Sequence, residues 1–223
     1  MAAPTEVTIK NLSGEWTMNK TLSNSTDPIL SLQGMSWLTR KALNIATVTL
    51  HINAYPDSED ASVIHIHIDQ TLTGGVKGTS EHRLSDGKKR EHTDHLFGHV
   101  EGQSRYIRGS TGSDGRVRPN QAFLTKSNDP KVVQFLNGEI LADGKHSDGF
   151  LVETSLGQEF GEGEGLWFQS FVESLDNGWT AEQIWGFEVI DGERYYTRRV
   201  VVAKGKQVEL ARFVYSYVGP RKE

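Results

Sequence analysis

Hydrophobic and polar residues alternate with a period of two along most of the 223-residue chain, and glycines or Asp-Gly pairs separate the alternating stretches. This pattern is typical of antiparallel strands joined by tight turns, because successive side chains of a strand point to opposite faces. Consecutive hairpins favour an all-β, up-and-down antiparallel barrel over a sandwich. The expected strands are residues 47–55, 63–72, 76–84, 88–95, 98–108, 150–156, 166–175, 179–190, 195–203 and 207–218.

Residues 27–46 have helical periodicity instead. Asp27 and Pro28 supply an N-cap and a first-turn proline, and apolar residues then recur at helical spacing. Gly34 divides this window into two short helices. We expect these helices to form a lid over the open end of the barrel, with a plug at the barrel bottom as the alternative.

The alternation weakens between residues 109 and 149, where glycines and prolines break up short apolar pieces. The chain is long for one small barrel and short for two. We therefore expect a single domain over residues 1–223, with an insertion at about 109–149.

Two short motifs resemble known families. The Gly-Glu-Trp of residues 14–16 resembles the Gly-x-Trp start of lipocalins. The Gly-Met-Ser-Trp-Leu-Thr-Arg-Lys of residues 34–41 is similar to the second lid helix of intracellular fatty-acid-binding proteins. Both families are calycins, so the resemblance implies a calycin-type barrel with a helical lid and a ligand cavity. The chain also resembles lipocalin-like proteins of fungi, some of which accompany terpenoid and polyketide pathways.

The last strand departs from the family pattern. Fatty-acid-binding proteins end in Arg-x-Tyr, whose side chains clamp a ligand carboxylate. If Tyr215 matches that tyrosine, Phe213 takes the place of the arginine, and Arg212 falls on the opposite face. The resemblance to lipocalins further implies that Trp16 plugs the closed end, and that Arg199 or Arg212 packs across its indole.

Two neighbouring expected strands, 76–84 and 88–95, have no apolar face. Either these strands are solvated on both sides, or their inner side lines a polar cavity. In the second case their ionisable groups are candidates for catalysis. Asp94 or Glu81 would donate a proton, and Arg83, Arg105 or His92 would stabilise an oxyanion.

Aromatic and apolar residues supply the candidate ligand-binding wall, for which ordinary barrel core is the alternative. Trp37 and Trp185 would shield a developing cation. The full set of candidate ligand-binding residues is Met35, Trp37, Tyr106, Trp185, Phe187 and Tyr215.

Metal binding is not expected. His65, His67 and Asp69 point to one side of their strand, but three ligands at this spacing reach one ion only if the strand bends strongly. Isoleucines fill the opposite side, so the isoleucines are expected inside and the histidines outside. No motif for a nucleotide, a nucleophilic serine or another cofactor is present, and the absence of cysteine excludes thiolate chemistry.

Composition limits the classes of molecule that the chain is expected to bind. The formal net charge of -5 and the absence of a basic stripe argue against nucleic acid. No apolar run is long enough for a membrane span, and no signal peptide is visible, so the chain is expected in the cytoplasm. We expect a hydrophobic small-molecule partner and two possible functions. One is a cofactor-independent cyclase or isomerase of a terpenoid or polyketide; the other is a non-catalytic carrier of a lipid or isoprenoid.

Overall fold

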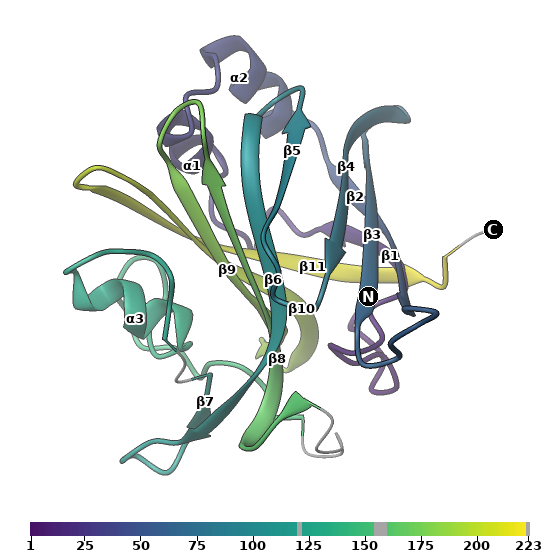
Figure 1. The fold of residues 1–223 in the computed structure, drawn as a ribbon, viewed down its shortest axis with the longest axis vertical. Coiled ribbons are helices and arrows are strands. Elements are labelled where there is room, and N and C mark those ends of the chain that lie inside the picture. Colours follow the sequence, from purple (N-terminus) through teal and green to yellow (C-terminus); the bar gives the residue numbers. More distant parts are fainter. Residues whose placement is uncertain (120–121, 154–159, 222–223) are drawn as a thin grey trace.

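The structure is a computed structural model that describes residues 1–119, 122–153 and 160–221. Strands dominate it, and the helices are short (Figure 1). In chain order the elements are β1 (Gly14–Met18), α1 (Asp27–Leu32), α2 (Trp37–Ile45), β2 (Val48–Pro56), β3 (Ile64–Leu72), β4 (Val76–Leu84), β5 (Arg90–Asp94), β6 (Gly98–Thr111), β7 (Val117–Arg118), α3 (Pro130–Leu136), β8 (Glu164–Ser174), β9 (Thr180–Ile190), β10 (Glu193–Lys204) and β11 (Gln207–Gly219).

One curled antiparallel sheet holds the strands in the order β4-β3-β2-β1-β11-β10-β9-β8-β6-β5, and β7 pairs with β6. Nearly every neighbour in this path is also a neighbour in sequence, so the all-β, up-and-down architecture expected from the hairpin pattern is confirmed. β4 and β5 are the two ends of the path. At one point the segment between them reaches β6, where Gly87 N donates to Ser104 O at 2.9 Å.

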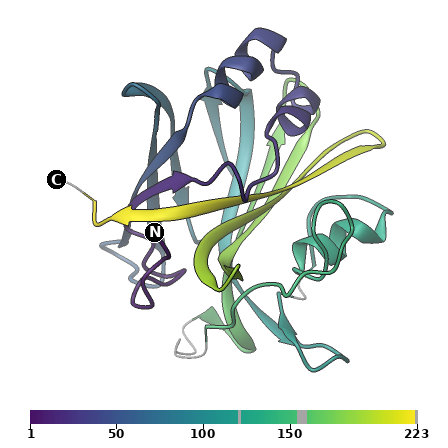
Figure 2. The ribbon, with the colours of Figure 1, turned by 180° about the vertical axis from the view of Figure 1, so that it is seen from behind.

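The two lid helices lie across one end of the curled sheet (Figures 1 and 2). Pro28 stands in the first turn of α1, and Gly34 follows that helix with a φ of +87°, a conformation that suits glycine. Ser36 caps α2 by accepting a hydrogen bond from Thr39 N. The lid position is therefore observed, while a role in ligand entry stays a prediction. Within the described residues, no helix has the length and apolar character needed to span a membrane.

The other end of the sheet is filled by an aromatic core. Trp16 is fully buried there, its ring packs against Phe187, Tyr196 and Tyr217, and its Nε1 donates to Leu12 O at 3.0 Å. Apolar residues of the N-terminal segment 3–12 join the same cluster. The expectation that Trp16 is a structural residue of the closed end agrees with this packing.

Neither Arg199 nor Arg212 packs across the Trp16 indole, so this expectation is wrong. Arg199 and Arg212 both lie on the outer face of the sheet, where each binds Glu188. Their strands place them on the side opposite to Trp16, because β10 and β11 alternate between inner and outer faces. Instead, Arg194 stacks on Phe187 with its guanidinium carbon 3.6 Å from the ring centroid.

The segment expected to be an insertion, residues 109–149, packs against the outer face of the sheet through its helix. Its helix α3 begins after Asp129, whose side chain accepts from Lys131 N, and α3 was not expected from the sequence. Phe135 and Leu136 of α3 are fully buried in a cluster that includes Val201 of β10. The prediction of a strand at 150–156 is wrong for residues 150–153, where Phe150 makes only an isolated bridge to Glu188. Residues 154–156 lie outside the described residues.

Candidate functional site

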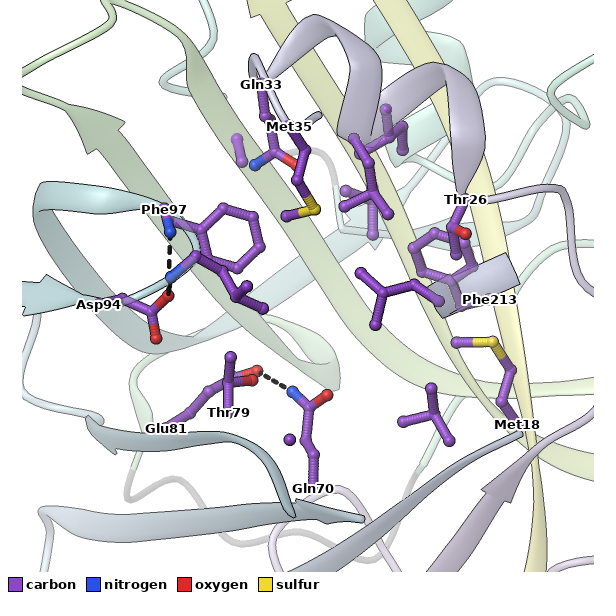
Figure 3. Close-up of a pocket in the computed structure, with 18 of the residues that line it drawn as sticks. Met18, Thr26, Gln33, Met35, Gln70, Thr79, Glu81, Asp94, Phe97 and Phe213 are labelled. Atoms are coloured by element: carbon purple, nitrogen blue, oxygen red, sulfur yellow. Dashed lines mark hydrogen bonds between the residues drawn. The ribbon is translucent and has the colours of Figure 1, made fainter. Parts of the chain in front are cut away.

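A cavity of about 820 Å³ lies between the lid helices and the aromatic core. Figure 3 shows side chains from the helices, from the turn after β5 and from β11 converging on it. Its upper walls are mainly apolar. They include Ile29, Leu30, Met35, Leu43, Phe97, Val200, Val202 and Phe213.

The deep end of the cavity is polar, as β10 illustrates. Val202, Val200 and Arg198 succeed one another on the inner face of this strand and line the cavity, and the next inward residue, Tyr196, belongs to the aromatic core. The cavity therefore changes from apolar to polar as it meets that core. We call this deep end the polar floor; its residues are Gln70, Glu81, Arg83, Gln183, Arg198 and Tyr215.

Glu81 is held by two neighbours, which donate three hydrogen bonds to its carboxylate. Oε2 accepts hydrogen bonds from Arg83 Nε at 2.9 Å and Nη2 at 2.8 Å, and Oε1 accepts from Gln70 Nε2 at 3.0 Å (Figure 3 shows the Gln70 bond). Burial raises the pKa of the Glu81 carboxyl, but the charges of Arg83 and Arg198 and these hydrogen bonds outweigh it. The net pKa lies below its ordinary value of 4.5, so Glu81 is ionised at neutral pH.

Arg198 is only 4% exposed, and not all of its N–H groups have a hydrogen-bond acceptor among the described residues. Its Nε donates to the Tyr196 hydroxyl at 2.9 Å, whereas its buried Nη2 has no hydrogen-bond partner among the described residues. Burial opposes the charge of this guanidinium, but the oxygens of Tyr196 and Tyr215 and the Glu81 carboxylate keep the pKa of Arg198 above its ordinary value. Arg198 is therefore a charged hydrogen-bond donor at the edge of an apolar cavity.

Trp185 lies beneath the two arginines of the polar floor. The guanidinium carbon of Arg198 is 3.9 Å from the Trp185 ring centroid, and that of Arg83 is 5.5 Å away. The indole Nε1 donates to Gln183 Oε1 at 2.8 Å, and Arg83 Nη1 donates to Ser170 Oγ at 2.6 Å. Trp185 is fully buried, so it supports the arginines and does not itself form the cavity surface.

Asp94 and His92 line the cavity from β5, and neither is among the residues that donate hydrogen bonds to Glu81. Asp94 Oδ1 accepts hydrogen bonds from the backbone N of Leu96 at 2.7 Å and of Phe97 at 3.0 Å, which fixes the turn after β5 (Figure 3). His92 is exposed. The cluster expected to combine Glu81, Arg83, His92 and Asp94 is therefore divided between the polar floor and the edge strand β5.

Besides Trp185, four predicted site residues do not line the cavity. Arg105 is exposed and donates to Gln169 Oε1 at 2.8 Å, because the alternation of β6 turns it outward. Trp37 is 63% exposed on α2, and the expectation that it lines the cavity is wrong. Tyr106 and Phe187 do point inward, but at a depth that the aromatic core fills. Met35 and Tyr215 line the cavity as expected.

The sequence reasoning did not include Arg198, Gln70 and Gln183 among the candidate site residues. A signal for the first was present: Arg198 and Arg199 are adjacent in a strand, so one of the two had to face inward in either register. The glutamines carried no such signal, because a neutral amide side chain is compatible with either face of a strand. Their role becomes visible only through their partners, Glu81 and Trp185.

Comparisons with known proteins identify relatives over the full length. This chain is 30% identical to pericyclase pydY of Acremonium sp. over 221 residues, which are 99% of each chain. It is 27% identical to the probable pericyclase scpY of Mollisia scopiformis over 220 residues, which are 99% of this chain and 96% of that protein.

Solved structures also match, at low sequence identity. Lipid binding protein 8 of Caenorhabditis elegans is 13% identical with a TM-score of 0.48, over 98% of this chain and 99% of that chain. Fatty-acid-binding protein 1 of Echinococcus granulosus is 12% identical with a TM-score of 0.46, over 93% and 98%. No family model matches the chain. The identity to pydY over almost the whole of both chains shows that this chain belongs to the pericyclase pydY family.

Proposed function

We propose that this chain is a pericyclase, which binds a hydrophobic, conjugated natural product of terpenoid or polyketide type in the cavity and converts it to an isomer. In a pericyclic step, bonds form and break through one cyclic shift of electrons, and no atom enters or leaves the substrate. Such a step requires no cofactor. Family membership supports this proposal, and so does a cavity within the roughly 300–1,000 Å³ typical of small-molecule sites.

The observation that carries the proposal is the guanidinium of Arg198 at the polar floor below apolar walls, whose Nη2 has no hydrogen-bond partner among the described residues. A carbonyl conjugated with the reacting double bonds accepts a hydrogen bond from this guanidinium. The hydrogen bond draws electron density from the double bonds and stabilises the polarised transition state. A charged donor in a site of low dielectric has a larger effect than the same donor in water.

The apolar walls contribute by shape. A flexible polyene must fold so that its reacting ends lie close together, and this costs conformational entropy. Walls formed by the lid helices and by Val200 and Val202 favour the folded conformer, because it buries more apolar surface. The polar floor then fixes the direction in which the substrate enters.

The proposal assigns Glu81 a positioning role. A carboxylate that stays ionised does not donate a proton at neutral pH, so the donor role first considered for Glu81 is dropped. Glu81 instead binds Arg83 through two hydrogen bonds and thereby holds the second arginine over Trp185. Asp94 and His92 remain candidates for contacts with the outer part of the substrate.

The experiment uses a synthetic substrate in which a flexible apolar chain joins a conjugated diene to an α,β-unsaturated carbonyl. Loss of diene absorbance with unchanged mass reports cycloisomerisation, and quenching of tryptophan fluorescence reports binding. We expect the wild type to accelerate the reaction and Arg198→Met to bind without accelerating it. Arg105→Gln is the matched control, since Arg105 is exposed on the outer face. Binding without acceleration in the wild type would favour the carrier function.

A further inference from the structure

Three histidines converge on the outer face of the sheet, away from the cavity. His65 and His67 alternate along β3 with isoleucines that are buried, and His82 of β4 stands directly opposite His67 in the antiparallel ladder. One ring nitrogen from each histidine lies within 4.8 Å of the other two. The histidines are therefore outside, as expected from the sequence, but the third member comes from the neighbouring strand. Asp69, the residue first considered beside them, accepts a hydrogen bond from Ser80.

A carboxylate orients the first of these rings. His65 Nε2 lies 2.7 Å from Asp57 Oδ2, and Asp57 Oδ1 is itself fixed by the backbone N of Glu59 and of Asp60. The imidazole therefore donates from Nε2, and its Nδ1 carries the lone pair. Nδ1 lies 2.9 Å from His82 Nε2. A carboxylate on the far nitrogen is the usual partner of a metal-ligating histidine, which makes the ring a stronger ligand.

Ring packing keeps the group together. Tyr55 stacks with His65 at 5.1 Å and with His67 at 5.8 Å between ring centroids, and His67 stacks with His82 at 3.8 Å. Metal–nitrogen bonds of about 2.0–2.1 Å in a tetrahedral site place ligand nitrogens about 3.3 Å apart. The ligand nitrogens lie within 4.8 Å of one another, so metal binding requires the rings to leave the stack of His67 on His82 and close to this spacing.

We propose that His65, His67 and His82 form a binding site for a divalent transition-metal ion of the zinc class. Three neutral imidazoles suit zinc, copper and nickel, and they leave a fourth position for water. On binding, the ion takes the place of the hydrogen bond between His65 Nδ1 and His82 Nε2, and the proton of His82 moves to its other ring nitrogen, so the three imidazoles stay neutral and no net proton is released. The ion joins β3 to the sheet-edge strand β4, where Glu81 and Arg83 flank His82 and face the opposite side. The site thus stabilises the strand that carries part of the polar floor.

The test is calorimetric titration of the untagged, chelator-treated chain with zinc sulfate, accompanied by thermal unfolding with and without zinc. We expect one equivalent to bind and the unfolding midpoint to rise, because the ion binds the folded chain. Cobalt in place of zinc should give the strong visible absorption of tetrahedral coordination. His67→Gln and His82→Gln should each abolish the one-equivalent binding, and Asp57→Asn should weaken it about 10- to 100-fold.

The matched control is His99→Gln, since His99 lies outside the group and contacts Glu91. This variant should bind zinc as the wild type does, and circular dichroism verifies the fold of every variant. Absence of saturable binding by the wild type at millimolar zinc would overturn the proposal. Undiminished binding by a folded double variant, His67→Gln with His82→Gln, would overturn it as well. None of these readouts depends on catalysis, so the pericyclase proposal stands or falls separately.

Discussion

Arg198 and Arg199 are neighbours in β10, yet they belong to opposite kinds of environment. Arg199 faces outward and uses all five of its N–H donors, on Glu188, Ser147 and the backbone oxygens of Phe135 and Ile140. Arg198 faces the cavity and has a buried nitrogen without a partner. Arg199, whose donors are all used, holds the fold together, whereas the role proposed for Arg198 is to bind a ligand. Burial alone therefore does not distinguish a structural charge from a functional one.

The largest effect that tests this comparison is on stability. Arg199→Met should lower the free energy of unfolding by about 3–5 kcal/mol, because it leaves the buried Glu188 carboxylate with Arg212 as its remaining charged partner. It also removes the donors that hold the insertion at α3. Urea unfolding measures the loss. A change below about 1 kcal/mol would show that the outer network is dispensable.

The second effect is on catalysis. Arg198→Met should lower turnover about 100-fold, or about 2.7 kcal/mol in transition-state free energy, if its free donor binds the reacting carbonyl. The same substitution should cost about 1–3 kcal/mol of stability, less than Arg199→Met, because it removes one hydrogen bond to Tyr196, the stack on Trp185 and a charge near Glu81, along with a buried N–H that has no partner. A variant that unfolds readily and turns over normally would reverse the assignment of the two arginines.

The pH dependence provides a third test. Glu81 has a folded-state pKa below 4.5, so its contribution to stability is present above that pH and is lost as the pH falls through the folded pKa. Turnover should consequently stay level between about pH 6 and pH 8. Glu81→Gln should reduce the acid-dependent part of the stability loss in denaturation curves. A rate that falls as the pH rises through this range would indicate a proton donor instead.

The smallest expected effect concerns the lid. Thr39 and Lys77 line the cavity from α2 and β4, and the chain has no cysteine, so cysteines introduced at these two positions can be joined by a flexible crosslinker. We expect the crosslink to slow release of a fluorescent apolar probe about tenfold, or about 1.4 kcal/mol in the barrier. The uncrosslinked double variant is the control. Equal release rates would mean that the ligand enters elsewhere.

The fold could be predicted from local patterns, while much of the site could not. Alternation fixes which residues of a strand share a face, and it placed Glu81, Arg83 and Tyr215 on the cavity side. Alternation does not tell how far an inward-facing residue lies from the lid along the inside of the sheet. This distance is what separates Phe187 in the aromatic core from Arg198 at the polar floor. Nor does alternation give cross-strand neighbours, so the contact between His65 and His82 became visible only from the register of β3 and β4.

Helix periodicity had a similar limit. It located α1 and α2 correctly, but it could not tell which apolar residues the lid would bury. Trp37 stands in the first turn of α2 and remains exposed, while Met35, in the connection before it, reaches the cavity. α3 was missed because its apolar residues span only seven positions, too few for a clear helical repeat.

The two end strands of the sheet also affect how copies of the chain behave toward one another. β4 and β5 each have one side without a ladder partner among the described residues, and unpaired strand edges tend to recruit strands from other molecules. Arg90, Glu91 and His92 crowd β5 with ionisable groups. Bringing a second strand alongside would bury these groups or set like charges against each other. The absence of an apolar face on these strands therefore also protects the chain against aggregation through its open edge.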